Sequence, residues 1–132
     1  MLISKGVVMR RNPDLIRDIA LAVEKLRPGE TLDSMPGVDM QELGSHVELM
    51  LDAGLIEGKV MPGFMGSIVA VMVFRLTWDG HDFLDAARSE TLWNKAKDSV
   101  IAPTASWTFE ILKEWLKTEI KNGLPTLRGL GN

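Results

Sequence analysis

Residues 47–80 read VELMLDAGLIEGKVMPGFMGSIVAVMVFRLTWDG. The apolar helical pattern at their start ends at Gly54, because glycine readily takes the left-handed conformation that closes a helix. A strand begins at Leu55, a glycine-rich turn follows, and an apolar strand returns to Leu76. Thr77 is a favourable cap for the next helix. This order predicts an α+β winged helix-turn-helix with a two- or three-stranded antiparallel wing and extra C-terminal helices.

Two helices are predicted ahead of the hairpin. The first starts after Asn12, a capping residue that is followed by proline, and ends by Pro28. The second runs from its cap Asp39 to Ala53, with residues 30–38 as a loop between the two helices. In a winged helix-turn-helix, this second helix is the recognition helix.

The returning strand, residues 67–76, is apolar at nearly every position. We therefore expect both of its faces to be covered, one by the helices before it and the other by a partner subunit or the C-terminal helices. Trp78 is expected to fill the corner between the hairpin and the next helix as a core residue.

Helical patterns also fill the C-terminal part. The helix after Thr77 is expected to break near residues 88–91, where Ser89 can cap again, and Thr104 or Ser106 caps a last helix. The predicted organisation is a flexible leader or alternative start at 1–8, a winged-helix domain at 9–101, an amphipathic helix at 104–122 that packs on the domain or in a dimer interface, and a flexible tail at 123–132.

Composition restricts the class of protein. The chain has 132 residues, a net charge of -3 and no cysteine. A chain of this length can form one hydrophobic core without disulfides. Its negative net charge gives it no overall attraction to phosphates or anionic lipids, which a basic chain would have. No apolar run is long enough for a signal peptide or a membrane span. We expect a cytoplasmic protein without cofactor, metal, small-molecule substrate or membrane contact.

Four sequence blocks carry a family resemblance: DLIR at 14–17, LDAGLIEG at 51–58, RLTWDGHDFLD at 75–85 and WNK at 93–95. With them the chain resembles a family of small bacterial and phage proteins of unknown function, roughly from Met9 to Ile120. The resemblance implies a winged-helix fold and frequent phage or prophage origin. It implies no established activity, so no functional residues carry over.

The predicted recognition helix is poorly suited to DNA. Its expected outward residues are Asp39, Gln41, Glu42, Ser45, His46, Glu48 and Asp52, and every charged residue from Pro28 through Gly58 is acidic. Carboxylates pressed against phosphates would add repulsion and release no counterions. If the chain binds DNA, the expected contacts are basic residues of the first helix and the wing, namely Arg10, Arg11, Arg17, Lys25, Arg27 and Lys59, or else a grouping of Arg75, Arg88, Lys95 and Lys97.

A protein partner is the alternative to DNA. The candidate contacts are Glu42, His46, Glu48 and Asp52 on the acidic helix and Phe64 and Met65 at the wing tip. A homodimer is expected through the last helix, with Phe109, Leu112, Trp115, Leu116 and Ile120 as its contacts.

Catalysis is not expected. His46 and His81 are the only histidines, and no nucleophile-elbow, phosphate-loop or metal motif is present. Two functions stay open: a DNA-linked transcriptional regulator, and a protein-binding adaptor or phage accessory protein acting on its host.

Overall fold

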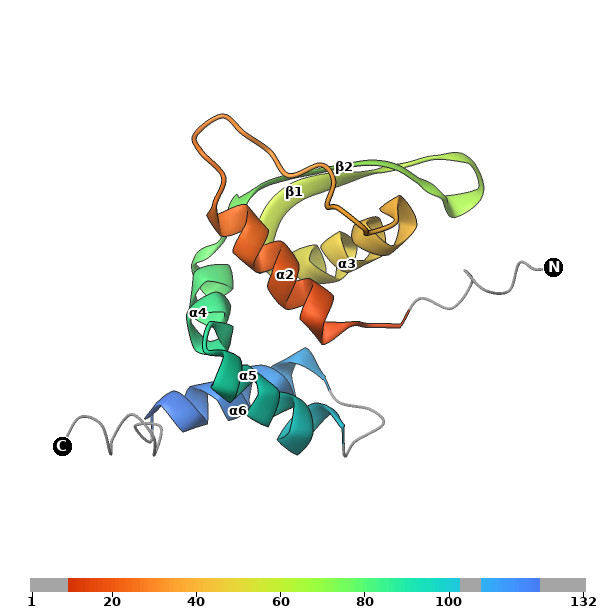
Figure 1. Cartoon of the computed structure of the whole chain (residues 1–132). Coiled ribbons are helices and arrows are strands. Elements are labelled where there is room, and N and C mark those ends of the chain that lie inside the picture. Colours follow the sequence, from red (N-terminus) through yellow and green to blue (C-terminus); the bar gives the residue numbers. More distant parts are fainter. Residues whose placement is uncertain (1–9, 103–107, 122–132) are drawn as a thin grey trace. The chain divides into compact units, whose positions relative to one another are not determined.

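The computed structural model describes residues 10–102 and 108–121 (Figure 1). The predicted leader at 1–8, the proposed caps Thr104 and Ser106, and the tail at 123–132 lie outside these ranges. The described residues form an α+β arrangement of five α-helices and one two-stranded antiparallel sheet. The chain divides into two compact units, one ending at His81 and the other starting at Asp82.

The first unit opens with α2, Pro13–Glu24. The Asn12 side chain accepts hydrogen bonds from the backbone N–H groups of Asp14 and Leu15, and proline occupies the first turn, which confirms the predicted helix start. One face of α2 is buried and consists of Leu15, Ile16, Ile19, Ala20 and Val23.

The second helix is α3, Met40–Asp52. The Asp39 carboxylate caps it by accepting from the N–H groups of Gln41 and Glu42. The helix stops before Gly54, whose φ of +73° is the left-handed conformation that the sequence predicts there. Residues 25–39 form turns and an extended stretch, as expected for the loop between the helices.

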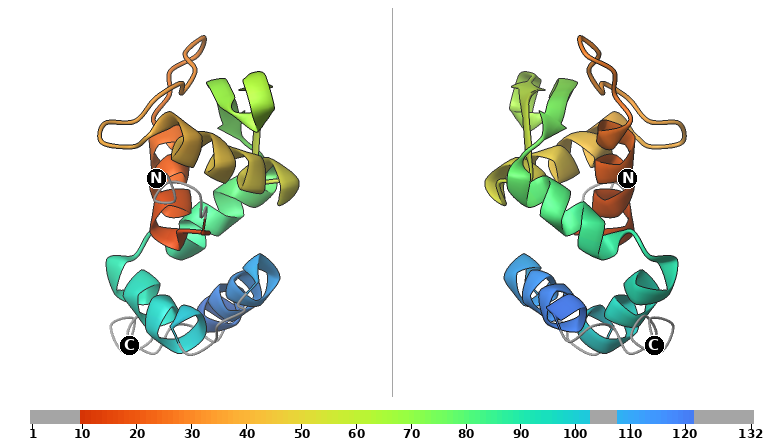
Figure 2. Two further views of the ribbon diagram at one scale, coloured as in Figure 1. Left: turned by 90° about the vertical axis from the view of Figure 1, so that its right-hand side faces the viewer. Right: turned by 90° about the vertical axis from the view of Figure 1, so that its left-hand side faces the viewer.

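The hairpin pairs β1, Ile56–Pro62, antiparallel with β2, Ile68–Leu76. Leu32 bridges Val73 on the other edge of β2 through two backbone hydrogen bonds of 2.9 Å. Figure 2 shows the hairpin and the loop between α2 and α3 projecting from the same side of the two helices.

Within the first unit only one face of β2 is covered, and cover of the other face by a partner subunit or the C-terminal helices stays a prediction. Val71 and Val73 are buried on the side of α3, whereas Val69, Met72 and Phe74 are exposed. The helices of this unit pack on only one side of the sheet, so the first unit by itself leaves the other face of β2 apolar and exposed.

Two sequence blocks meet behind the hairpin. The Thr77 N–H donates to the Leu55 carbonyl at 2.9 Å, the Thr77 hydroxyl donates to the Gly54 carbonyl at 2.5 Å, and the Gly80 N–H donates to the Thr77 hydroxyl at 3.0 Å. A Cβ at Gly80 would lie 1.9 Å from the Leu55 carbonyl oxygen, so only glycine fits there. The LDAGLIEG and RLTWDG blocks thus fix α4, Trp78–Ala87, to the turn that follows α3.

Trp78 does not fill this corner. Its side chain is 81% exposed, which corrects the expectation that it is a core residue. Gly80, and not the tryptophan, faces the turn, because the backbone of α4 approaches Leu55 too closely for any side chain.

The second unit contains the rest of α4, α5 at Glu90–Ala96, the π-helical turn η2 at Lys97–Ile101, and α6 at Phe109–Lys121. The predicted break before α5 is confirmed, with Ser89 as the cap. Phe83 packs edge-on against Trp93 and lies 5.3 Å from Phe109 between ring centroids. None of the helices within 10–102 and 108–121 is long and apolar enough to cross a membrane.

Candidate functional site

The exposed side of α3 is committed partly to holding the hairpin. The Gln41 Oε1 atom accepts from the Ile68 N–H at 2.8 Å, and its Nε2 donates to the Ile68 carbonyl at 2.8 Å. Both polar ends of this amide are therefore used by the start of β2. Glutamine is a typical reader of adenine, but this one has no free donor and acceptor pair to offer a base. The sequence pattern gave no signal for this role.

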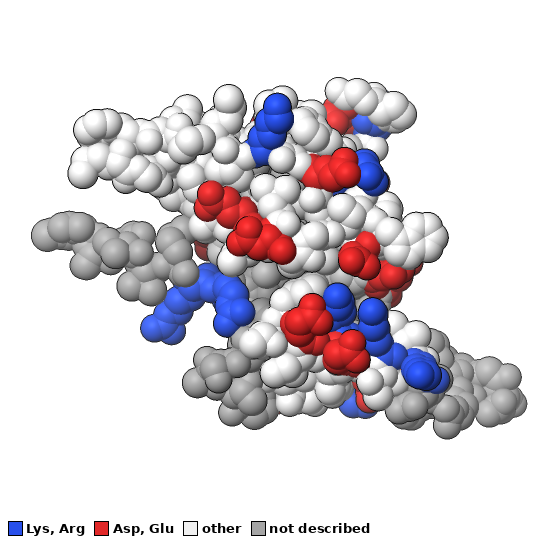
Figure 3. Space-filling view, turned by 180° about the vertical axis from the view of Figure 1, so that it is seen from behind, with Lys and Arg blue, Asp and Glu red and all other residues white. Residues whose placement is uncertain are grey.

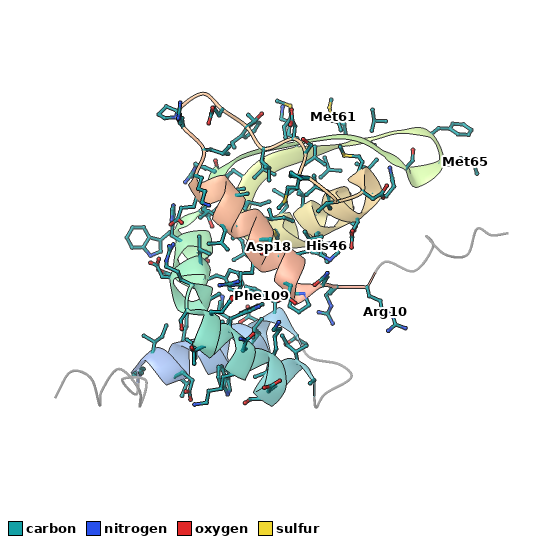
Figure 4. All side chains as sticks on the ribbon, viewed as in Figure 1. Arg10, Asp18, His46, Met61, Met65 and Phe109 are labelled. Carbon is teal, nitrogen blue, oxygen red and sulfur yellow. The ribbon has the colours of Figure 1, made fainter. Side chains whose placement is uncertain are left out.

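His46 faces inward, which corrects its expected place among the outward residues. It is 1% exposed, and its Nε2 accepts from the Asn12 N–H at 2.9 Å. Its Nδ1 lies 2.8 Å from the Glu42 carbonyl, so these partners assign a hydrogen to Nδ1. Figure 4 labels His46 where α3 meets the start of α2. His46 thus joins two helices and is not a surface contact.

The carboxylates of Glu48 and Asp52 do face solvent. They stand one helical turn apart on the wall of a groove between α3 and β1, with a volume of about 800 Å³. Among the described residues, neither carboxylate has an ion pair or hydrogen bond. The groove is lined by Glu48, Leu51, Asp52, Gly58, Lys59, Val60, Met61 and Pro62. Glu42, the remaining acidic candidate, is half-buried near the start of α3.

The hairpin tip presents the most exposed apolar side chains of the described chain, Phe64 at 85% and Met65 at 87%. The loop is closed by hydrogen bonds from the Gly63 N–H to the Ser67 carbonyl and from the Ser67 N–H and hydroxyl to the Phe64 carbonyl, at 2.7 to 3.1 Å. Met65 takes a φ of 56°, a conformation that costs a non-glycine residue about 1 kcal/mol. Figure 4 shows Met65 at the far end of the hairpin.

The apolar surface continues along the hairpin. Met61 stands opposite Ala70, and Lys59 stands opposite Met72, so these four share one face of the sheet with Phe74. Residues 60–74 contain no charged side chain. In Figure 3 the hairpin projects at the upper left as a white surface, with red carboxylates below it.

The basic candidates do not form one surface. Arg10 and Arg11 precede α2 and Lys25 and Arg27 follow it, so the twelve residues of the helix separate the two pairs by about 18 Å. Arg17 is half-buried on α2, Asp14 and Asp18 lie on the same helix, and Lys59 lies on β1. Figure 4 labels Arg10 beyond the start of α2 and Asp18 along it.

The dimer candidates on α6 divide into two sets. Leu112 and Leu116 are each 1% exposed on a helix that packs against α5 and η2, and Phe109 packs against Phe83. The two leucines are thus buried in the chain's own core, and a homodimer through α6 stays a prediction. Trp115 is half-buried, Ile120 is 44% exposed, and Ile111, which the sequence pattern did not single out, is 53% exposed.

No group of three His, Cys, Asp or Glu side chains in the described ranges is arranged to hold a metal ion. His81 is exposed in the first unit, and it lines a smaller pocket with Arg27, Glu30 and Phe74.

Comparison with known proteins gives two matches. A family model described as "Hypothetical protein (DUF2513)" matches residues 10–106. An uncharacterized protein of Haemophilus influenzae is 31% identical over 119 residues, which cover 88% of this chain and 99% of that protein. No solved structure matches significantly.

Proposed function

The chain belongs to the DUF2513 family of hypothetical proteins, and we propose that it is a winged-helix protein that acts, without catalysis, by binding a partner protein through its hairpin. The element order supports the winged-helix interpretation. Helix α2, the extended residue Leu32, helix α3 and the β1–β2 hairpin follow one another as the first helix, the short strand, the recognition helix and the wing of such a fold.

The observation that carries the proposal is the exposure of Phe64 and Met65 on a closed tip. The closed loop holds two large apolar side chains in water, and one of them, Met65, has an unfavourable backbone conformation. Both features raise the free energy of the isolated chain. A partner that buries both side chains removes their apolar area from water and so lowers the free energy of the complex. Extended apolar surface of this kind is typical of sites that bind other proteins.

A protein partner is favoured over DNA by the chemistry of α3. The amide of Gln41 is occupied, His46 is buried, and the Ser45 hydroxyl donates to the Glu42 carbonyl. The exposed charges that remain on the helix are carboxylates, which phosphates repel. The residues just before α3 form a turn at 36–37, where helix-turn-helix proteins have the helix that crosses the DNA backbone.

One observation favours a second function, DNA-linked regulation. The Asn12 N–H bond to His46 fixes the chain next to α3, so the exposed Arg10 and Arg11 emerge beside that helix. In this second function, these arginines would contact phosphates and α3 would stay out of the groove.

A site-specific photo-cross-linker in place of Phe64 tests the proposal in a lysate of the source organism. We expect a discrete protein adduct, which excess unlabelled chain removes by competition. A Met65→Ser change in the competitor should weaken that competition, whereas Ile111→Ser, an equally apolar change elsewhere, should not. The same chain is titrated with a DNA duplex from its own upstream region at two salt concentrations.

Two results would count against the proposal. One is competition by the Met65→Ser chain that equals that of the unaltered chain. The other is tight, salt-sensitive DNA binding that Arg10→Ala/Arg11→Ala abolishes, which would support the second function instead.

A further inference from the structure

We infer that the groove between α3 and β1 binds an extended segment of the partner in which basic side chains alternate with apolar ones. The inference rests on the proposed function and adds the chemistry of the partner. Three features of the groove carry it: an open strand edge, a pair of unpaired carboxylates, and an apolar wall.

The strand edge comes from the sheet topology. The sheet has only two strands, and Leu32 occupies the outer edge of β2 at Val73. Among the described residues, β1 has no backbone partner other than β2, and residues 58–62 of this strand line the groove. An edge strand offers unpaired N–H and C=O groups to an incoming extended chain. Register shifts at Glu57/Gly58 and Met61/Pro62 limit the regular edge to Gly58–Met61, so the added strand would be short.

The carboxylates select the charge of the segment. Glu48 and Asp52 are like charges four residues apart at the C-terminal end of α3, where the helix dipole also disfavours anions. The last turn of α3 contains no basic residue to offset them, and Lys59, the one cation among the residues that line the groove, lies on the sheet face that it shares with Met72. This placement is unfavourable in the isolated chain, and cationic side chains of a partner would relieve it.

The spacing of the two carboxylates fits an extended chain. Four residues of α-helix rise about 6 Å, and side chains on the same face of a strand recur about every 6.6 Å. Basic side chains at alternate positions can therefore meet Glu48 and Asp52 in turn. The apolar side chains between them would point to the opposite face of the added strand, where Met61 lies.

Selection of random peptides displayed on phage against the full-length chain tests the inference. We expect the selected peptides to alternate lysine or arginine with apolar residues. A synthetic peptide of the selected sequence should bind about three- to tenfold more weakly to Glu48→Gln/Asp52→Asn, measured by fluorescence anisotropy. The control Asp18→Asn/Asp33→Asn removes the same net charge at exposed sites outside the groove, and it should leave the affinity unchanged. Amide NMR shifts on binding should concentrate at residues 58–61.

Several outcomes would overturn the inference: no selected peptides, an acidic or uncharged consensus, equal weakening by both double variants, or displacement of the peptide by a DNA duplex. The cross-linking assay at Phe64 separates this inference from the proposed function. If Met65→Ser weakens competition for the partner and Glu48→Gln/Asp52→Asn does not, the hairpin binds a protein but the groove does not hold a basic segment. If neither variant weakens competition, both proposals are wrong.

Discussion

At the residue scale, two polar side chains of α3 bind backbone groups of the chain itself. His46 and Gln41 are the polar residues on α3 with the richest chemistry, yet each is used up by a backbone partner, the first at Asn12 and the second at Ile68. Gly80 serves the fold because it has no side chain: the backbone of α4 lies too close to the Leu55 carbonyl for a Cβ at this position.

Replacing Gly80 by alanine should destabilise the chain by about 3 kcal/mol, because the added methyl group would collide with the Leu55 carbonyl and the backbone would have to move. Urea unfolding followed by circular dichroism measures the change. Asp79→Ala, an exposed neighbour in the same turn, should cost no more than about 1 kcal/mol. Similar unfolding midpoints for the two variants would show that the contact between α4 and the turn is not rigid.

Replacing His46 by leucine should cost about 1 to 3 kcal/mol, because the Asn12 N–H would lose its acceptor in a buried place while the volume stays filled. His46→Gln should recover part of this loss, since a glutamine oxygen can accept the same N–H. Urea unfolding of the two variants compares them. Equal losses would mean that packing, and not the hydrogen bond, decides the role of His46.

At the scale of elements, the hairpin is held to α3 near its tip by one side chain and at its base by the buried valines of β2. A long hairpin with one open face needs such a tether to keep its tip in a fixed position. The tether also joins the two walls of the surface that we propose for partner binding.

Gln41→Ala should release the end of the hairpin while leaving the rest of the first unit folded. Both hydrogen bonds to Ile68 are lost at an exposed site, so we expect a loss of about 1 kcal/mol in stability. Hydrogen exchange at residues 63–69 should accelerate, and exchange in α2 should not. Gln41→Glu keeps the acceptor for the Ile68 N–H and should give an intermediate effect. Unchanged exchange at these residues would mean that the hairpin loop orders itself.

At the scale of the whole molecule, the apolar residues divide into those buried in the core and those exposed to other chains. The second unit uses Leu112 and Leu116 internally, whereas the exposed large apolar side chains of the first unit, apart from Trp78 on α4, lie on the hairpin. If the chain forms a homodimer, the hairpin has more open apolar surface to offer than the buried stripe of α6.

Leu112→Ala and Leu116→Ala should each destabilise the chain by about 2 to 5 kcal/mol, as expected for deletions in a packed core. Ile120→Ser, at an exposed site on the same helix, should leave stability within about 0.5 kcal/mol. Thermal unfolding with light scattering measures stability and mass together. A change from dimer to monomer in the leucine variants, without loss of stability, would restore α6 as the dimer element.

The sequence by itself determined the elements, because their signals are local. Asn12 and Asp39 as caps, Gly54 as a helix stop and the turn between two apolar strands each depend on a few neighbouring residues, and the structure confirms them. Family membership also followed from short blocks along the chain.

Only the tertiary structure decided which residues are available for function. The burial of His46 and the occupation of Gln41 depend on partners 34 and 27 residues away, and the exposure of Trp78 and Phe74 depends on the absence of a covering layer in their unit. Local pattern carries no information on such contacts, since an apolar strand looks the same whether one face is covered or both. For the same reason, the groove between α3 and β1 became visible only when the helix and the strand edge were placed side by side.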